Sequence, residues 1–149
     1  MSKIIFFLFF LFFGFSELAH TKDEYFRTLR YEKVNLRQGP AKDYPIKIFY
    51  KKKFLPVLIQ DSSDNFRKVR DHENNSGWIH VSQLTKKKAA IVTGGDLLMF
   101  KNATIYSSPI VILKEGRLVK IDKCKDNWCK ARSAGFKGWI KNKNLWGLY

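Results

Sequence analysis

Short runs of alternating apolar and polar residues, separated by polar turns, recur along the chain from residue 34 onward. A period of two is the pattern of a strand with one buried face, whereas an amphipathic helix needs a period of 3.6. A tight helical turn is expected over 81–84, and 141–146 corresponds to this closing turn in the second half. Many short strands with regularly spaced turns predict an all-β fold built from small antiparallel barrels. The expected strands are 34–40, 46–50, 54–59, 66–70, 77–80, 89–93, 97–101, 117–123, 128–133 and 136–140.

The second half of this pattern repeats the first. Gly77-Trp78-Ile79 returns sixty-one positions later as Gly138-Trp139-Ile140. The segments before it also match, so the register holds over about fifty residues. A repeat of this period predicts two structural units of similar fold. The matching upstream segments are 66–70 with 128–132 and 44–48 with 108–112.

The N-terminus has a different pattern. Lys3 precedes ten apolar residues, 4–13, and small or polar residues follow. This is the pattern of a signal peptide, and the apolar run is shorter than the roughly 20 residues of a spanning helix. We expect a signal peptide over 1–16, cleaved after Ser16 with Gly14 at the third position back, although cleavage after Ala19 is an alternative. The protein is therefore expected to be exported, either periplasmic or secreted, with no stable membrane span after cleavage.

The remaining chain divides into a leader and two domains. Residues 17–30 are polar and mixed in charge without a clear period, which indicates a short leader. Barrels are expected over 31–85 and 89–149, and the basic run between them, 85–88, is most simply a solvated connector. Units this small bury a smaller share of their surface than larger domains do, so each half should rely on its neighbour, a crosslink or a ligand.

The chain is strongly basic. It has 28 lysines and arginines against 13 acidic residues, a formal net charge of +15. From residue 97 to the end, eleven basic residues face three acids, so a net +8 belongs to the second repeat. Such a surface attracts polyanions, among them nucleic acid, acidic lipid headgroups and anionic cell-wall polymers. Compositional bias of an AT-rich genome is the alternative explanation. Nucleic acid is not the expected partner, because the chain has an export pattern and lacks the aromatic-basic motifs of known nucleic-acid modules.

The two ends of the first repeat resemble those of a bacterial SH3-like domain. An Asn-x-Arg-x-Gly-Pro opening at Asn35 to Pro40, a Tyr-Pro at Tyr44 and a Gly-Trp closing strand at Gly77 carry the resemblance. The second repeat lacks this opening but keeps Pro109, Trp128-Cys129 and Gly138-Trp139, and it ends in Leu145-Trp146-Gly147. The whole is similar to the exported tandem SH3-like proteins of alphaproteobacteria. The resemblance implies two SH3-like barrels in tandem after the signal peptide. Its motifs are specific for the fold and weak for the ligand.

Cys124 and Cys129 are the only two cysteines, and they flank a short turn. A hairpin places such residues opposite each other, and an exported chain meets oxidants, so we predict that they form a disulfide. A redox pair or half of a metal site has less support, because the spacing is not Cys-x-x-Cys and no histidine is close in sequence.

The sequence gives little support to catalysis. No histidine lies near the cysteines, and His80, which follows Gly-Trp-Ile, is better explained by packing or capping. There is no phosphate-binding glycine-rich loop and no zinc-hydrolase signature. We therefore predict no catalytic residues, no metal, no cofactor and no enzymatic activity.

The aromatic residues are the stronger candidates for binding. If Ile79 and Ile140 face the core, the alternation of a strand leaves the rings of Trp78 and Trp139 at the surface, although each ring could also simply cover its own barrel. Amphipathic rings among lysines suit a peptide or glycan that carries carboxylates or phosphates. The candidate ligand-binding residues are Tyr44, Tyr50, Trp78, Tyr106, Trp128 and Trp139.

These patterns predict an exported, non-catalytic module that binds a cell-envelope component. The expected ligand is the peptide or glycan of peptidoglycan, with an envelope protein second. The alternative is a structural or assembly protein whose aromatic surface is the interface between the barrels or with another protein. Full burial of both Trp78 and Trp139 would exclude the groove hypothesis.

Overall fold

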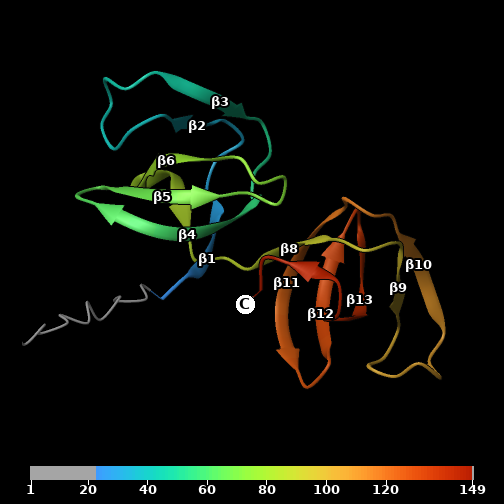
Figure 1. Ribbon diagram of the computed structural model, residues 1–149. Helices are drawn as coiled ribbons and strands as arrows, with labels where there is room; N and C mark the ends of the chain where they lie inside the picture. Colours follow the sequence, from blue (N-terminus) through green and yellow to red (C-terminus); the bar gives the residue numbers. More distant parts are fainter. Residues whose placement is uncertain (1–22, 149) are drawn as a thin grey trace, which may run out of the picture.

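The computed structural model describes residues 23–148, and the expected signal peptide over 1–16 lies outside them. The described chain is an all-β structure of two seven-stranded antiparallel sheets, one per repeat (Figure 1). The first sheet has the order β3-β2-β6-β5-β4-β1-β7, and the second repeats it as β10-β9-β13-β12-β11-β8-β14. Within the described residues, no helix is long and apolar enough to cross a membrane.

Most of the strands lie where the sequence predicts them, whereas 25–29, 84–85, 109–113 and 145–146 were not among the expected strands. In the first repeat they are β1 Tyr25–Leu29, β2 Val34–Arg37, β3 Ile46–Tyr50, β4 Pro56–Ser63, β5 Phe66–Arg70, β6 Ser76–His80 and β7 Leu84–Thr85. In the second they are β8 Ala89–Val92, β9 Leu97–Phe100, β10 Pro109–Leu113, β11 Leu118–Lys125, β12 Trp128–Ser133, β13 Phe136–Lys141 and β14 Leu145–Trp146. The expected helical turn is the 3-10 helix Val81–Gln83.

The leader expected over 17–30 is wrong for its last residues. Strand β1 lies there and pairs with β4 on one side and β7 on the other, so it belongs to the first sheet. The sequence of β1 does not alternate, because Thr28 is polar and yet buried. The Thr28 hydroxyl donates a hydrogen bond to the Lys87 carbonyl at 2.7 Å, which compensates for its burial.

The glycine of each Gly-Trp pair is required because two strands lie close together there. A Cβ at Gly77 would lie 2.6 Å from the Arg37 carbonyl oxygen, and one at Gly138 would lie 2.6 Å from the Phe100 carbonyl oxygen. Only glycine permits this approach of backbone to backbone. The next positions, Ile79 and Ile140, are fully buried, as expected if the neighbouring tryptophans face outward.

The two cores are not independent. Strand β8 is buried on both faces, so its residues alternate between two cores. Ala90 and Val92 pack in the core of the second repeat, whereas Ile91 packs in the core of the first together with the partly buried Leu118. The ring of Trp146 also crosses the junction, at 4.9 Å from Phe26 between ring centroids in an edge-to-face arrangement. Each small repeat therefore relies on its neighbour for part of its core.

Candidate ligand-binding surface

The outer face of the second repeat gathers two of the predicted tryptophans. On β12, Trp128 and Lys130 point away from the core, since Cys129 between them is fully buried. The register pairs Trp128 with Lys141 and Lys130 with Trp139 on β13. Side chains at i and i+2 on paired strands share one face, so the two tryptophans lie diagonally to each other on the outside of the sheet. Both are partly buried.

Lysines and one further aromatic ring complete this surface. The ammonium of Lys141 lies 5.2 Å from the Trp128 ring centroid, and those of Lys123 and Lys130 lie 5.8 and 6.0 Å from that of Trp139. Such contacts are cation–π interactions, which hold a positive charge beside an aromatic face. The Phe100 ring meets Trp128 edge to face at 5.7 Å. We call these residues the Trp128–Trp139 surface: Phe100, Lys123, Trp128, Lys130, Trp139 and Lys141.

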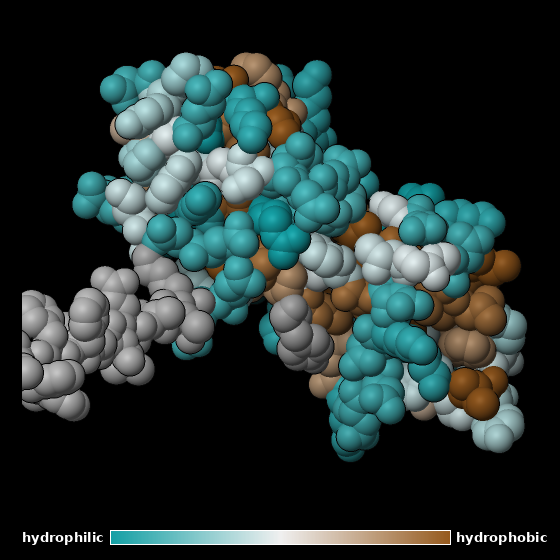
Figure 2. Space-filling view, in the orientation of Figure 1, coloured by the Kyte–Doolittle hydropathy of each residue, from teal (hydrophilic) through white to brown (hydrophobic). Residues whose placement is uncertain are grey.

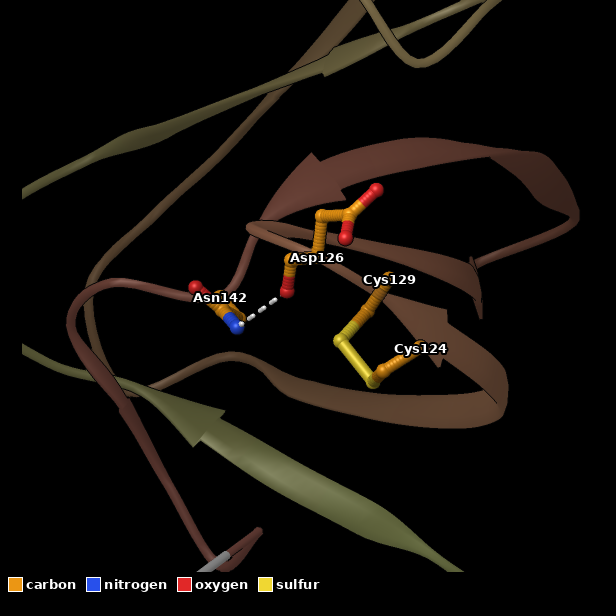
Figure 3. The surroundings of a disulfide bond; sticks show 4 residues. All are labelled: Cys124, Asp126, Cys129 and Asn142. Carbon is orange, nitrogen blue, oxygen red and sulfur yellow. Dashed lines mark hydrogen bonds between the residues drawn. A yellow bond between two sulfur atoms is a disulfide. The ribbon is translucent and has the colours of Figure 1, made fainter.

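The disulfide fixes the hairpin that carries Trp128. Cys124 and Cys129 are bonded, as predicted, and face each other on β11 and β12 (Figure 3). Asp126 takes a positive φ of 53° in the turn, and Asn142 donates from its side chain to the Asp126 carbonyl at 3.2 Å. The Asn142 backbone N–H donates to the Asn127 carbonyl at 3.0 Å. The strand that starts at Trp128 is therefore held by a covalent bond and by two hydrogen bonds.

Reduction of this disulfide should destabilise the second repeat modestly. The closed loop is short, so we expect a loss of about 2 kcal/mol or less, at the low end of the usual range. Thermal unfolding with and without reductant measures the difference. The Cys124→Ala/Cys129→Ala variant is the control and should be insensitive to reductant. An unchanged unfolding temperature of the native protein on full reduction would contradict the expectation.

In the first repeat, the equivalent outer face, around Trp78, exposes less aromatic surface. Trp78 is opposite Lys68 on β5 and Arg37 on β2, and it is partly buried. Phe66 occupies the position that Trp128 has in the second repeat, but it is buried under the ring of His80 at 5.1 Å. His80 also caps the 3-10 helix through a hydrogen bond from the Ser82 backbone N–H, so it has both of the roles expected for it.

The other predicted site residues have different surroundings. Tyr44 is 45% exposed, its ring leaves no room for a Cβ at Gly39, and its carbonyl accepts from Arg37 at 2.9 Å, which places it close to the Trp78 face. Tyr106 is 92% exposed in the loop between β9 and β10, and no contact within residues 23–148 joins its ring to either tryptophan surface. These candidates therefore divide between the two repeats and do not line one groove.

The prediction for Tyr50 is wrong. Its side chain is buried, and its hydroxyl donates to Asp71 Oδ2 at 2.8 Å. Burial, and next the hydrogen bond to Asp71, raise the pKa of the Tyr50 phenol far above its ordinary value, so the phenol stays protonated and donates. Tyr50 therefore has a structural role, and its buried side chain is not accessible to a ligand.

Sequence reasoning missed most of the lysines around Trp128 and Trp139. The turn between β12 and β13 has two residues, Ala134 and Gly135, both with positive φ. A two-residue turn sets the register of a hairpin, so the pairing of Lys130 with Trp139 could have been counted from the sequence. The contact of Phe100 could not, because it depends on the non-local pairing of β13 with β9.

Hydrophobic side chains collect on another part of the second repeat. In Figure 2, brown atoms gather over β9 and β10, and teal atoms cover the part where β11 and β12 run. The exposed apolar residues there include Leu98, Ile110 and Ile112, of which Ile112 is 56% exposed. Within the described residues, no cluster of three or more His, Cys, Asp or Glu side chains could hold a metal ion.

This architecture is that of two small β-barrels with partly exposed aromatic and basic residues, a class suited to binding. A family model for the bacterial SH3 domain matches the chain twice, over residues 30–86 and 95–147. The chain therefore belongs to the bacterial SH3 domain family, as its motifs indicated. Domains of this family are typically binding domains and often bind the cell wall.

Comparison with other proteins adds little beyond the family. No curated protein matches the sequence. Among solved structures, NlpC2 and NlpC1 from Trichomonas vaginalis are 15% and 14% identical, each with a TM-score of 0.37. The matches cover 83% and 85% of this chain but 48% and 47% of those chains, so the chain spans about half their length. No functional conclusion follows from a likeness at that level.

Proposed function

We propose that the protein is an exported, non-catalytic binding protein that recognises a component of the bacterial cell envelope. The first ligand we propose is the peptide or glycan of peptidoglycan, and the second is an envelope protein. The observation that carries this proposal is the Trp128–Trp139 surface, where two partly exposed indole rings lie among three lysines.

The chemistry of that surface suits a glycopeptide. An indole face offers a large, rigid contact area for the apolar side of a sugar ring at a low entropic cost. The lysine ammonium groups can pair with the carboxylates of a wall peptide, and they are long enough to reach a ligand seated on the rings. The disulfide and the hydrogen bonds of Asn142 hold Trp128 in place before the ligand arrives, which lowers the cost of binding.

The cysteines and His80, which are the residues best suited to catalysis, have structural roles instead. Both cysteines are in the disulfide, so neither supplies a thiolate nucleophile. His80 is occupied in capping and in packing on Phe66. A binding role without chemistry is the function that these assignments support.

Export is supported by the same disulfide. Disulfides persist in oxidising compartments such as the periplasm or the extracellular space, and they are rare in the cytosol. The apolar run after Lys3 supplies the signal that such a route requires.

The alternative is that the protein has a structural or assembly role, with its aromatic surface as an interface. The sequence allowed this interface to lie between the barrels or with another protein. The ring contacts at the junction of the repeats involve Phe26, His72 and Trp146, none of which was a candidate. Trp128 and Trp139 face away from the core of the second repeat, so their surface is open to an external partner. An assembly role would then use the Trp128–Trp139 surface against another protein.

Binding to purified peptidoglycan sacculi tests the proposal. Trp139→Ala should weaken retention about 30-fold, the effect of losing a central aromatic contact of about 2 kcal/mol. Trp78→Ala makes the same change in the first repeat and should alter retention less than threefold. The measurement is the fraction of protein that sediments with sacculi over a range of sacculus concentrations.

Two outcomes would contradict this assignment. If the native protein is not retained even at low salt, it does not bind the wall. If retention disappears in moderate salt for native protein and both variants alike, charge alone explains it, because exposed charges are screened over about 10 Å at 0.1 M salt.

A further inference from the structure

A second candidate site lies at the junction of the two repeats. A cleft of about 430 Å³ opens there, and its walls come from both repeats and from the linker between them. Phe54 belongs to the first repeat, Lys87 and Lys88 to the linker, and Lys120 and Arg132 to strands β11 and β12 of the second. It shares no residue with the Trp128–Trp139 surface. Its size is in the range of small-molecule sites, about 300–1,000 Å³.

Several cations converge on one aromatic ring in this cleft. Among the lining residues, the ammonium of Lys120 lies 4.8 Å from the Phe54 ring centroid and that of Lys87 lies 5.7 Å from it. Lys53, which does not line the cleft, approaches the same ring to 5.3 Å. Groups of like charge repel one another, so their approach to a common point is unfavourable unless an anion joins them. Within residues 23–148, no carboxylate forms an ion pair with Lys87, Lys88 or Lys120.

The single acid of the cleft is already paired. Arg132 donates to Asp122 Oδ1 from Nε at 2.9 Å and from Nη2 at 2.6 Å. These two hydrogen bonds orient the guanidinium, and the charge of Asp122 is neutralised by Arg132. Four basic residues of the lining against one acid leave a net charge of +3 in the cleft.

The linker lysines are held in position from both sides. The Lys87 carbonyl accepts from Thr28 of the first repeat, and the Lys88 carbonyl accepts from the Ile121 backbone N–H of the second at 3.0 Å. The expectation that this run is a solvated connector is therefore incomplete, since its backbone is fixed where the cleft forms. A site that is already assembled binds its ligand at a lower entropic cost.

Phe54 has an unusual backbone at the same place. Its φ is 64°, in the left-handed region that bulky residues rarely adopt, and its N–H donates to the Leu29 carbonyl at 2.9 Å. Strained positions of this kind cluster at binding sites, where the surrounding structure maintains them. The ring of Phe54 lines the cleft at this position.

We propose that this cleft binds a phosphorylated sugar or the phosphorylated sugar unit of an envelope polymer. A phosphate with two negative charges matches the convergent lysines, which bind phosphates as point charges. A single carboxylate would leave two of the three net positive charges uncompensated. The Phe54 ring gives the apolar wall against which a sugar ring packs. This site is independent of the tryptophan surface and extends the function to a second ligand group.

Titration of the purified protein with glucose 6-phosphate at low ionic strength tests this site. The Lys87→Gln/Lys120→Gln variant should bind at least tenfold more weakly, because both ammonium groups face the cleft. The matched control is Lys101→Gln/Lys143→Gln, which removes the same charge at exposed positions outside the cleft and should change the dissociation constant less than twofold. All four lysines are exposed, so the variants should keep the native unfolding temperature.

Two further measurements test the contributions of the sugar ring and of the phosphate separately. Phe54→Leu should weaken glucose 6-phosphate several-fold and leave inorganic pyrophosphate unaffected, and glucuronate should bind at least tenfold more weakly than glucose 6-phosphate. No binding of glucose 6-phosphate, or equal losses in the two double variants, would overturn the proposal, the second because it indicates diffuse charge. Trp139→Ala should keep this affinity even where it loses sacculus binding.

Discussion

Replacement of Asp71 by alanine should destabilise the protein by about 3 kcal/mol, because this buried carboxylate organises the turn between β5 and β6. Asp71 is 1% exposed and accepts four hydrogen bonds. They come from the Tyr50 hydroxyl at 2.8 Å, the Glu73 N–H at 3.0 Å, the Asn75 N–H at 2.8 Å and the Asn75 side-chain amide at 2.9 Å. Without the carboxylate, donors on three residues lose their acceptor, and one of them, the Tyr50 hydroxyl, is buried.

The effect should extend to the junction of the repeats. His72 follows Asp71 in this turn, and its ring centroid lies 6.1 Å from that of Trp146 in the second repeat. A turn that loses its central acceptor no longer positions His72, so part of the contact between repeats is lost too. The second repeat has no such device, because its equivalent turn has only two residues, Ala134 and Gly135.

Denaturant unfolding measures this loss for Asp71→Ala. Tyr50→Phe should cost about 1 kcal/mol, since it removes one of the four bonds and leaves the acceptor in place. Asp43→Ala is the matched control: the same change of charge at an exposed acid should alter the free energy of unfolding by less than about 0.5 kcal/mol. Equal stabilities for Asp71→Ala and Asp43→Ala would show that the carboxylate has no organising role.

Replacement of Ile91 by alanine should both destabilise the protein and uncouple its two repeats. Ile91 is 1% exposed and belongs to the second sheet by its pairing with Leu118 and Trp146, yet its side chain packs in the core of the first repeat. Truncation of a buried isoleucine costs about 2–5 kcal/mol, from lost burial and from the cavity that remains. Because Ile91 packs across the junction, the free energy lost is that of the contact between the two repeats.

The shape of the unfolding transition distinguishes this effect from a general loss of stability. In repeat proteins the contact between neighbours is what makes them unfold together. We expect one transition for the native protein and two separate transitions by calorimetry for Ile91→Ala. Ile91→Val should cost about 0.5–1.5 kcal/mol and keep one transition.

Ile112→Ala serves as the control at an exposed isoleucine of β10 and should have little effect. A single transition for Ile91→Ala with unchanged stability would mean that the repeats do not share a core through β8. Uncoupling should also open the lysine-lined cleft, so Ile91→Ala should lose affinity for glucose 6-phosphate while Ile112→Ala keeps it.

The sequence by itself determined the two-barrel architecture and the local hairpins. The repeat of Gly77-Trp78-Ile79 gives the duplication, and the alternation gives β3, β5 and β12 with the bounds that the structure has. The two cysteines gave the disulfide for the same reason, since residues that flank a short turn face each other. Pairings of this kind depend on turn length and on the period of two, both of which are local.

The tertiary structure alone decided which side chains meet across the chain. It buried Tyr50 on Asp71, placed β1 between β4 and β7, and put Ile91 of one repeat in the core of the other. It also brought the linker lysines to Phe54 and Lys120, so a run that reads as a solvated connector lines a cleft. These contacts join residues far apart in sequence, and their partners are set by packing and by the closure of each sheet, for which a local pattern carries no signal.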